Sequence, residues 1–443
     1  MTRPSNVGAA LRLVCALGII LQGGSRAQTP ADAAGVAPNV GQIVEFQDVV
    51  KATSWSRSRN GLYLSFGAPY PRQVLSVFVP EKVYRELPKN LGLLERTVRI
   101  KGLLEASPSG PMVNLISLQQ FALLPIDESA LAKLRLDGEI EREHFMAAEV
   151  QVFEREEFST LEVLAEELRQ SRERFSDGTW LMTAFFDALK LPIEATPEHY
   201  AATDQKINRW IAAYPASPVP VVAKAGYHVN LAWKWHETQP AGKLTSEALA
   251  GFKRELANAR QILEANPSAK SCPEYFVKME MVAKGQRWRR EHFVGLFDEA
   301  VSREREYYGI YFQAARYYLH CGKEGDWERF AMQMRQRFGP GGAGDALYAR
   351  IAWSMRSNYQ RMPQGTAVSW EIMATGLEGL MKQYPASRSL KNAYPNFAWR
   401  AHDRVRLRAA LPAIKANPDM ALWVNLENLR LAEQFANGAP VTN

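Results

Sequence analysis

Histidine and cysteine are the side chains of this chain best suited to act as general bases, nucleophiles or metal ligands. The chain has 443 residues, with seven histidines and three cysteines spread along it. None of them lies in His-Glu-x-x-His or Cys-x-x-Cys, and neither G-x-S-x-G nor a phosphate-binding loop occurs. His320 and Cys321 are adjacent, but neighbours on a helix point about 100° apart and do not form a base–nucleophile pair. We therefore expect a protein that is not an enzyme, with no catalytic residues and no cofactor.

A short acidic stretch is the nearest approach to a metal site. Glu139, Glu141, Glu143 and His144 lie close together in sequence, and carboxylate and imidazole are metal ligands. They belong to a segment rich in both acids and bases, for which a solvated helix face is the favoured interpretation. We expect no metal.

Aromatic and arginine side chains alternate in another stretch. A π-face can stack on a base or a sugar ring while a guanidinium holds a phosphate or hydroxyl, so this composition suits a ligand platform. The alternative is that Tyr63 and Phe66 are core residues beside an ordinary soluble turn. The candidate ligand residues are Trp55, Arg57, Arg59, Tyr63, Tyr70 and Arg72.

Strand patterns surround this platform. Residues 41–50, 61–67, 73–79, 94–105 and 112–121 are rich in β-branched and aromatic residues, and a short helix is expected at 81–87. Five strands with a helix after the third is the order of the five-stranded oligonucleotide/oligosaccharide-binding (OB) barrel, whose ligand surface is the face of strands two and three. The sequence predicts such a barrel over 40–125.

Three motifs in this region resemble a known family. NGLYLSFGAPYP at 60–71, TVRIKG at 97–102 and MVNLISL at 112–118 are similar to the small OB barrel domains of secreted bacterial proteins. The resemblance covers about 40–122 and implies a barrel without catalytic residues. The turn ASPSG at 106–110 departs from the family, whose members usually carry an aromatic-Lys-Gly turn there.

The first 27 residues have the composition of a secretory signal peptide. Arg3 and Arg12 precede the apolar run 13–21, and Ser25-Arg26-Ala27 provides the small residues that signal peptidase requires. The sequence predicts cleavage after Ala27, a periplasmic or secreted protein and no transmembrane span afterwards; a retained anchor is the alternative. Residues 28–39 are expected to form a flexible lead.

Charge also divides the chain. Residues 1–27 hold three of the 54 basic residues and none of the 47 acidic ones, so their removal lowers the net charge from +7 to +4. This weak basicity does not by itself indicate nucleic acid. Residues 126–153 are expected to form an acidic connector between the barrel and the remaining chain.

From 154 onward the periodicity is helical. An amphipathic helix is expected in 154–175, stopped by Ser176-Asp177-Gly178, and a second one follows towards 189. Twelve further helices are predicted at 197–214, 218–237, 246–266, 273–286, 289–304, 306–320, 326–338, 343–359, 369–384, 387–401, 404–416 and 418–437. Prolines such as Pro215, Pro385 and Pro418 separate helices in the manner of a degenerate tetratricopeptide-like array.

A second resemblance begins in the same region. The stretches FSTLEVLAEELRQSRERFSDGTWL, SREREYYGIYFQAARYYL and YARIAW are similar to an uncharacterised bacterial family of helical domains, over about 154–355. It implies a helical domain and no chemistry. The inner curve of such an array is the usual surface for a protein partner.

Two basic runs and two cysteines remain. Arg287, Arg289 and Arg290 form one candidate basic patch, and 400–408 is a second arginine-rich run. Cys272 and Cys321 should lie at opposite ends of two parallel helices, about 20 Å apart and too far for a disulfide. The sequence thus favours an exported, non-enzymatic binding or scaffold protein, with a barrel for a small or polymeric ligand and an array for a protein partner. An oligonucleotide or an oligosaccharide is a candidate ligand of the barrel. The alternative is an extracytoplasmic nucleic-acid-binding protein that uses the barrel.

Overall fold

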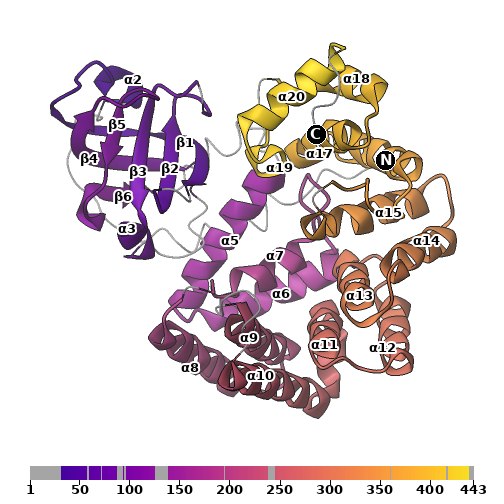
Figure 1. Cartoon of the computed structure of the whole chain (residues 1–443). Helices are drawn as coiled ribbons and strands as arrows, with labels where there is room; N and C mark the ends of the chain where they lie inside the picture. Colours follow the sequence, from indigo (N-terminus) through magenta and orange to yellow (C-terminus); the bar gives the residue numbers. More distant parts are fainter. Residues whose placement is uncertain are drawn as a thin grey trace. The chain divides into compact units, whose positions relative to one another are not determined.

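The chain forms two compact units in a computed structural model, residues 1–152 and residues 153–443 (Figure 1). The structure describes residues 31–56, 59–70, 72–86, 93, 96–124, 138–193, 195–237, 245–359, 361–415 and 418–438. The first unit is built from strands and the second from helices. Each is described by itself below.

The first unit contains a closed barrel, which confirms the predicted fold class. Its elements in chain order are β1 (Ile43–Ser56), β2 (Gly61–Phe66), β3 (Leu75–Pro80), α3 (Glu81–Glu86), β4 (Thr97–Glu105) and β5 (Met112–Asn114). β1 pairs antiparallel with both β2 and β4, and β3 pairs parallel with β5, which closes the sheet. A register irregularity between Val50 and Ala52 lies where β1 passes from one partner strand to the other, as expected for a bend that closes a small barrel.

Alternation along the strands fills the barrel. In β4 the side chains of Val98, Ile100 and Leu104 are buried, while Arg99, Lys101 and Leu103 between them are exposed. The inward residues of all strands meet in one apolar cluster, whose largest members include Phe46 and Phe66 with their rings packed edge to face.

The N-terminal side of the barrel differs from its prediction. Part of the expected flexible lead forms the short helix α2 (Ala33–Val36), and the side chain of Asp32 caps it by accepting a hydrogen bond from the Gly35 amide at 2.8 Å. Ala33 and Val36 are buried in the barrel cluster. These two apolar side chains thus hold the small, Pro-containing segment against the barrel. The predicted fifth strand also divides, into β5 and β6 (Phe121–Leu123), around the short 3-10 helix Leu118–Gln120.

The second unit is helical, and its helix bounds lie close to those predicted. They are α6 (Phe158–Ser171), α7 (Leu181–Ala188), α8 (Pro197–Ala213), α9 (Pro218–Glu237), α10 (Ser246–Ala265), α11 (Pro273–Gly285), α12 (Arg290–Arg303), α13 (Tyr308–Cys321), α14 (Asp326–Phe338), α15 (Ala343–Ser354), α16 (Trp370–Gln383), α17 (Arg388–Arg400), α18 (Arg404–Ile414), α19 (Met420–Trp423) and α20 (Leu426–Ala436). Consecutive helices pack against one another, as in an array of helix pairs (Figure 1).

Local chemistry explains many of these ends. Prolines occupy the first turn of α8 and α11, where a missing amide costs nothing, and Thr196 and Thr245 cap α8 and α10. The first helix of the array ends at Ser171, earlier than predicted, because Arg172 takes the left-handed conformation. Gly178, with φ +83°, instead makes the turn between Phe175 and Thr179. Similarly, the predicted last helix divides into α19 and α20 at Val424, whose φ is +68°.

The acidic connector is also more ordered than expected. Its C-terminal part forms α5 (Gly138–Glu154), in which Phe145, His144 and Glu149 are fully buried. The interpretation of Glu139 and His144 as a solvated face was therefore wrong. Among the described residues, no cluster of three potential metal ligands is found, and no described helix combines the length and apolarity that crossing a bilayer requires.

Candidate functional site

The predicted ligand face of the barrel carries Arg59 folded onto its own strands. Its guanidinium lies 4.2 Å from the centroid of the Phe78 ring, donates to the Tyr63 hydroxyl at 2.7 Å and donates to Asn114 Oδ1 at 3.2 Å. Asn114 in turn donates to Glu105. Tyr63 lies on this outer face beside Phe78, with ring centroids 4.9 Å apart, whereas Phe66 is in the core. The structure thus places Arg59 against Tyr63 and Phe78, and its guanidinium is already hydrogen-bonded within the barrel.

The other candidate ligand residues of the barrel either lie away from Arg59 or fall outside the residues that the structure describes. Tyr70 and Arg72 are exposed in the connection that follows β2, whereas Arg59 precedes it. Six residues of strand separate the two groups, about 20 Å at the usual rise. Arg57 and the side chain of Trp55 fall outside the described residues. Of the six candidates, the structure brings together Arg59 and Tyr63.

The three arginines of the predicted basic patch do not form one surface. Arg290 approaches Asp326, with Nη1 3.5 Å from Oδ2, and stacks over the Tyr318 ring. Arg289 is the exposed residue that precedes α12. Arg287, with φ +52°, instead lines a cavity on the other side of α11.

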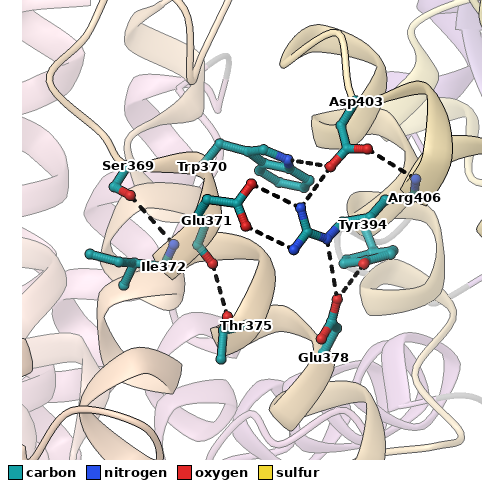
Figure 2. Close-up of polar contacts among 9 residues, drawn as sticks. All are labelled: Ser369, Trp370, Glu371, Ile372, Thr375, Glu378, Tyr394, Asp403 and Arg406. Carbon is teal, nitrogen blue, oxygen red and sulfur yellow. Dashed lines mark hydrogen bonds and ion pairs between the residues drawn. The ribbon is translucent and has the colours of Figure 1, made fainter.

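Arg406 of the second arginine-rich run is bound by acidic side chains of the same unit (Figure 2). Arg406 makes a bidentate pair with Glu371, at 3.0 and 2.8 Å, and donates to Asp403 at 2.7 Å. Trp370 Nε1 donates to the same Asp403 oxygen at 2.9 Å. The hydrogen bonds that Arg406 donates to Glu371 and Asp403 outweigh burial and raise the pKa of Arg406. This cluster joins α16 to α18 and is not a free basic surface.

The helical unit contains a groove of about 1350 Å³. It is lined by α7, the segment 189–193, α9, α10, α11 and α13, with two residues from the 3-10 helix Arg356–Asn358. Drug-sized ligand pockets are typically about 300–1,000 Å³, so this groove is large enough for more than a small molecule. Its position between successive helix pairs corresponds to the inner surface expected of an array.

Contacts near both ends of α11 hold it against α13, and these two helices form part of the groove lining. Near the start of α11, Tyr307 donates to Glu274 Oε1 at 2.6 Å and accepts from Thr183 at 2.8 Å. At its end, the Cys321 thiol lies 3.5 Å from the Lys284 carbonyl. α11 and α13 therefore run parallel with matched ends. Cys272 and Cys321 are free, as the helix order predicts, and burial raises the pKa of both thiols.

One end of the groove is electrically balanced. Lys278 Nζ lies 2.8 Å from Glu274 Oε2, and the side chains are 13% and 2% exposed. Burial opposes the charge on Lys278, but Glu274 and Asp187 outweigh it and raise the pKa of this lysine. Lys278, Lys190, Glu274 and Asp187 all line the groove, so two lysines and two carboxylates lie at this end.

The other end is cationic. Lys284, Arg287, Arg316 and His320 line it, about 15 Å along α11 from Glu274 by helical rise. Within the described part of the chain, the Arg287 and Arg316 side chains have no hydrogen bond or ion pair. Burial lowers the pKa of Arg316 with no offsetting acid, and burial together with Lys284, Arg316 and Arg287 lowers that of His320. This end lacks the negative charge that its residues would favour.

Apolar and aromatic side chains form the wall between the two ends. Trp233 packs edge to face on Phe252 with centroids 5.2 Å apart, and Lys284 Nζ lies 4.2 Å from the Trp233 ring centroid. Phe312 and Met281 also line the groove. Trp233 Nε1 and Gln313 Oε1 are buried and have no hydrogen-bond partner among the described residues.

Sequence reasoning named one residue of the groove, Arg287, and missed Arg316, Lys284 and Trp233. Arg316 carried a usable signal, because it is the one cation within AARYY at 314–318 of a largely aromatic helix. A charge so placed must snorkel to water or to a ligand. His320 was noted only as a neighbour of Cys321.

Comparison with known proteins adds no identification: no family model, curated protein or solved structure matches the chain.

Proposed function

We propose that this chain is an exported, non-enzymatic binding protein whose helical unit holds a segment of a partner protein in the groove between α7 and α13. The observation that carries the proposal is the groove itself, about 1350 Å³ in volume and lined jointly by five helices. An apolar wall supports binding of side chains, and charged ends support orientation. Export rests on the signal-like segment that ends at Ala27.

The barrel is the second proposed surface, for an oligosaccharide or oligonucleotide. In its support, Arg59, Phe78 and Tyr63 form a stacked cation–aromatic platform. A ligand there must displace the hydrogen bonds of Arg59 to Tyr63 and Asn114, which disfavours it relative to the groove. This platform also supports the alternative function in extracytoplasmic nucleic-acid binding.

A photo-crosslinking amino acid placed in the groove of the full chain, in its native cells, tests the main proposal. Leu249 lines the groove and is 38% exposed, so a probe there keeps access to a bound partner. Val405, 81% exposed on α18, is the matched control outside the groove. We expect a discrete protein adduct from position 249 that position 405 does not give.

Equal adducts from both positions, or none from 249, would reject the groove as the partner site. An adduct at 249 that nuclease removes would favour the nucleic-acid alternative. N-terminal sequencing of the exported chain tests localisation: Gln28 as first residue supports cleavage after Ala27, and a chain that retains 13–21 contradicts it.

A further inference from the structure

The cationic end of the groove has chemistry that its own chain does not use. We propose, building on the proposed function, that the groove selects a peptide segment with acidic side chains at one end and apolar side chains along its length. The acidic end lies on Arg316 and Arg287, and the apolar part lies against Trp233, Phe252 and Phe312. The partner is thus recognised by charge and apolar pattern together.

Charge complementarity is the first support. Arg316 is partly buried, Arg287 is exposed after the end of α11, and both line the groove, yet neither has an acidic partner among the residues that the structure describes. Arg335 of this unit has such a partner in Asp345 at 2.6 Å, whereas Arg350, which does not line the groove, also has two buried guanidinium nitrogens without a hydrogen-bond partner among the described residues. A desolvated cation without a partner is unfavourable unless a ligand completes it. Carboxylates fit this role, since a guanidinium offers them a bidentate arrangement.

Unsatisfied polar atoms in the wall are the second support. Trp233 Nε1 is a donor without an acceptor, and Gln313 Oε1 is an acceptor without a donor, within the described residues. A peptide backbone carries both a carbonyl and an amide, so it supplies the two groups that these atoms lack once their side chains turn toward it. An inorganic anion supplies only acceptors.

The distribution of charge favours a peptide over a nucleic acid. A polynucleotide presents a phosphate at every step and is held by a continuous basic track. In this groove Arg287 and Arg316 lie at the end of α11 and α13, while Glu274 and Asp187 lie at the other end with Lys278 and Lys190. Phosphates at that end would meet carboxylates.

A peptide array provides the test. Short peptides that carry Glu, Gln, Lys, Leu or Phe in all combinations are probed with the full chain, as wild type and as the variants Arg316→Gln and Arg287→Gln. Arg361→Gln is the control, because Arg361 is exposed before α16 and does not line the groove. We expect retained peptides to carry Glu toward one end with Leu and Phe elsewhere. Replacing their Glu by Gln should weaken binding about tenfold or more.

The variants assign this preference to residues. Arg316→Gln should abolish the preference for Glu over Gln, Arg287→Gln should reduce it, and Arg361→Gln should leave it unchanged. Retention without a Glu preference, retention of no peptide, or an unchanged preference in Arg316→Gln would each overturn the inference. If a protein is crosslinked in the groove but Glu is not preferred, the proposed function stands and this inference falls.

Thermal unfolding separates a ligand-binding arginine from a structural one. Because Arg316 is partly buried and has no acidic partner among the described residues, its replacement by Gln should leave the melting temperature equal or higher. A clear fall in melting temperature together with loss of peptide preference would mean that Arg316 supports the fold, and would overturn its assignment as a ligand contact.

Discussion

Glu280 is an acidic residue that is buried outside the groove, away from any described hydrogen-bond donor. Glu280 of α11 is completely buried, and both its carboxylate oxygens lack a hydrogen-bond partner among the described residues. Burial raises the pKa of Glu280 well above its ordinary value of 4.5. A carboxyl in such surroundings is stable only as the neutral acid. Unlike Arg316 it does not line the groove, so we assign it no ligand.

Glu280 should therefore make the stability of the protein depend on pH. The folded-state pKa is raised, so the stabilisation is complete below pH 4.5 and is lost as pH rises toward the folded-state pKa. In that window the slope is about 1.4 kcal/mol per pH unit. Glu280→Gln keeps the shape without the ionisable proton. We expect its free energy of unfolding to exceed the wild-type value increasingly above pH 4.5, in denaturant titrations.

Glu371→Gln provides a control of opposite sign. The hydrogen bond from Arg406 holds the pKa of Glu371 below 4.5, so its contribution is present above that pH and lost as pH falls. This variant should therefore lack any gain at higher pH. If Glu280→Gln behaves like Glu371→Gln, the carboxyl of Glu280 is charged in the folded protein and its assigned surroundings are wrong.

His320 reports on the cationic end without any ligand. Burial, Lys284, Arg316 and Arg287 lower its pKa below 6.5, because a protonated ring would add one more positive charge. An NMR titration of the His320 ring should give a midpoint below that value. Arg316→Gln and Arg287→Gln should each move it upward, whereas Arg361→Gln should not. Identical midpoints in all four proteins would contradict the clustering of these charges.

At the scale of the element, sequence patterns predicted the helices well, because the residues that begin and end a helix act locally. Pro197, Pro218 and Pro273 begin helices where the pattern placed them, and α14 has the predicted bounds. Barrel strands followed alternation in the same way. Errors arose where a non-glycine residue took a positive φ, as Arg172 and Val424 do, since residue type gives little warning of that conformation.

The packing of elements depends on features that local patterns do not reveal. A Cβ on Gly376 would lie 2.1 Å from the Asp345 carbonyl oxygen and 2.8 Å from the Ala349 Cβ, so α15 and α16 approach each other through this glycine. Gly379 lies three residues further along the same helix and would meet nothing within 4 Å. The sequence gives no sign of which glycine is the contact.

These two glycines make a matched pair of substitutions. Gly376→Ala should destabilise the helical unit by about 1–3 kcal/mol, because the new methyl group overpacks against the backbone of α15. Gly379→Ala should stabilise it by about 0.5–1 kcal/mol, through helix propensity alone. Denaturant unfolding of both variants measures the difference. Equal effects would show that the approach of α15 to α16 is looser than described.

For the whole molecule, the sequence predicted two units of different kinds but not the site. The change from a period of two to a period of 3.6 revealed the units, since each period is a property of neighbouring residues. The groove is assembled from residues as distant in sequence as Thr183 and Asn358, which line one cavity only after the helices pack. Composition singled out the run at 287–290, and folding sends Arg287 to the groove and Arg290 toward Asp326.

Two units with separate cores should also unfold separately. The barrel cluster draws on residues between Ala33 and Phe121, and the helical unit begins at residue 153. Residues 125–137 lie in the sequence between the last described strand and α5, so a cut among them leaves the chain of every described strand and helix continuous. Limited proteolysis of the full chain should therefore cut first in this stretch, and mass spectrometry should find a β-rich fragment and a helical fragment. Each purified fragment should keep its own circular-dichroism signature and unfold cooperatively. First cuts within α6 to α18, or a barrel fragment that unfolds on release, would show that the two units depend on a shared core.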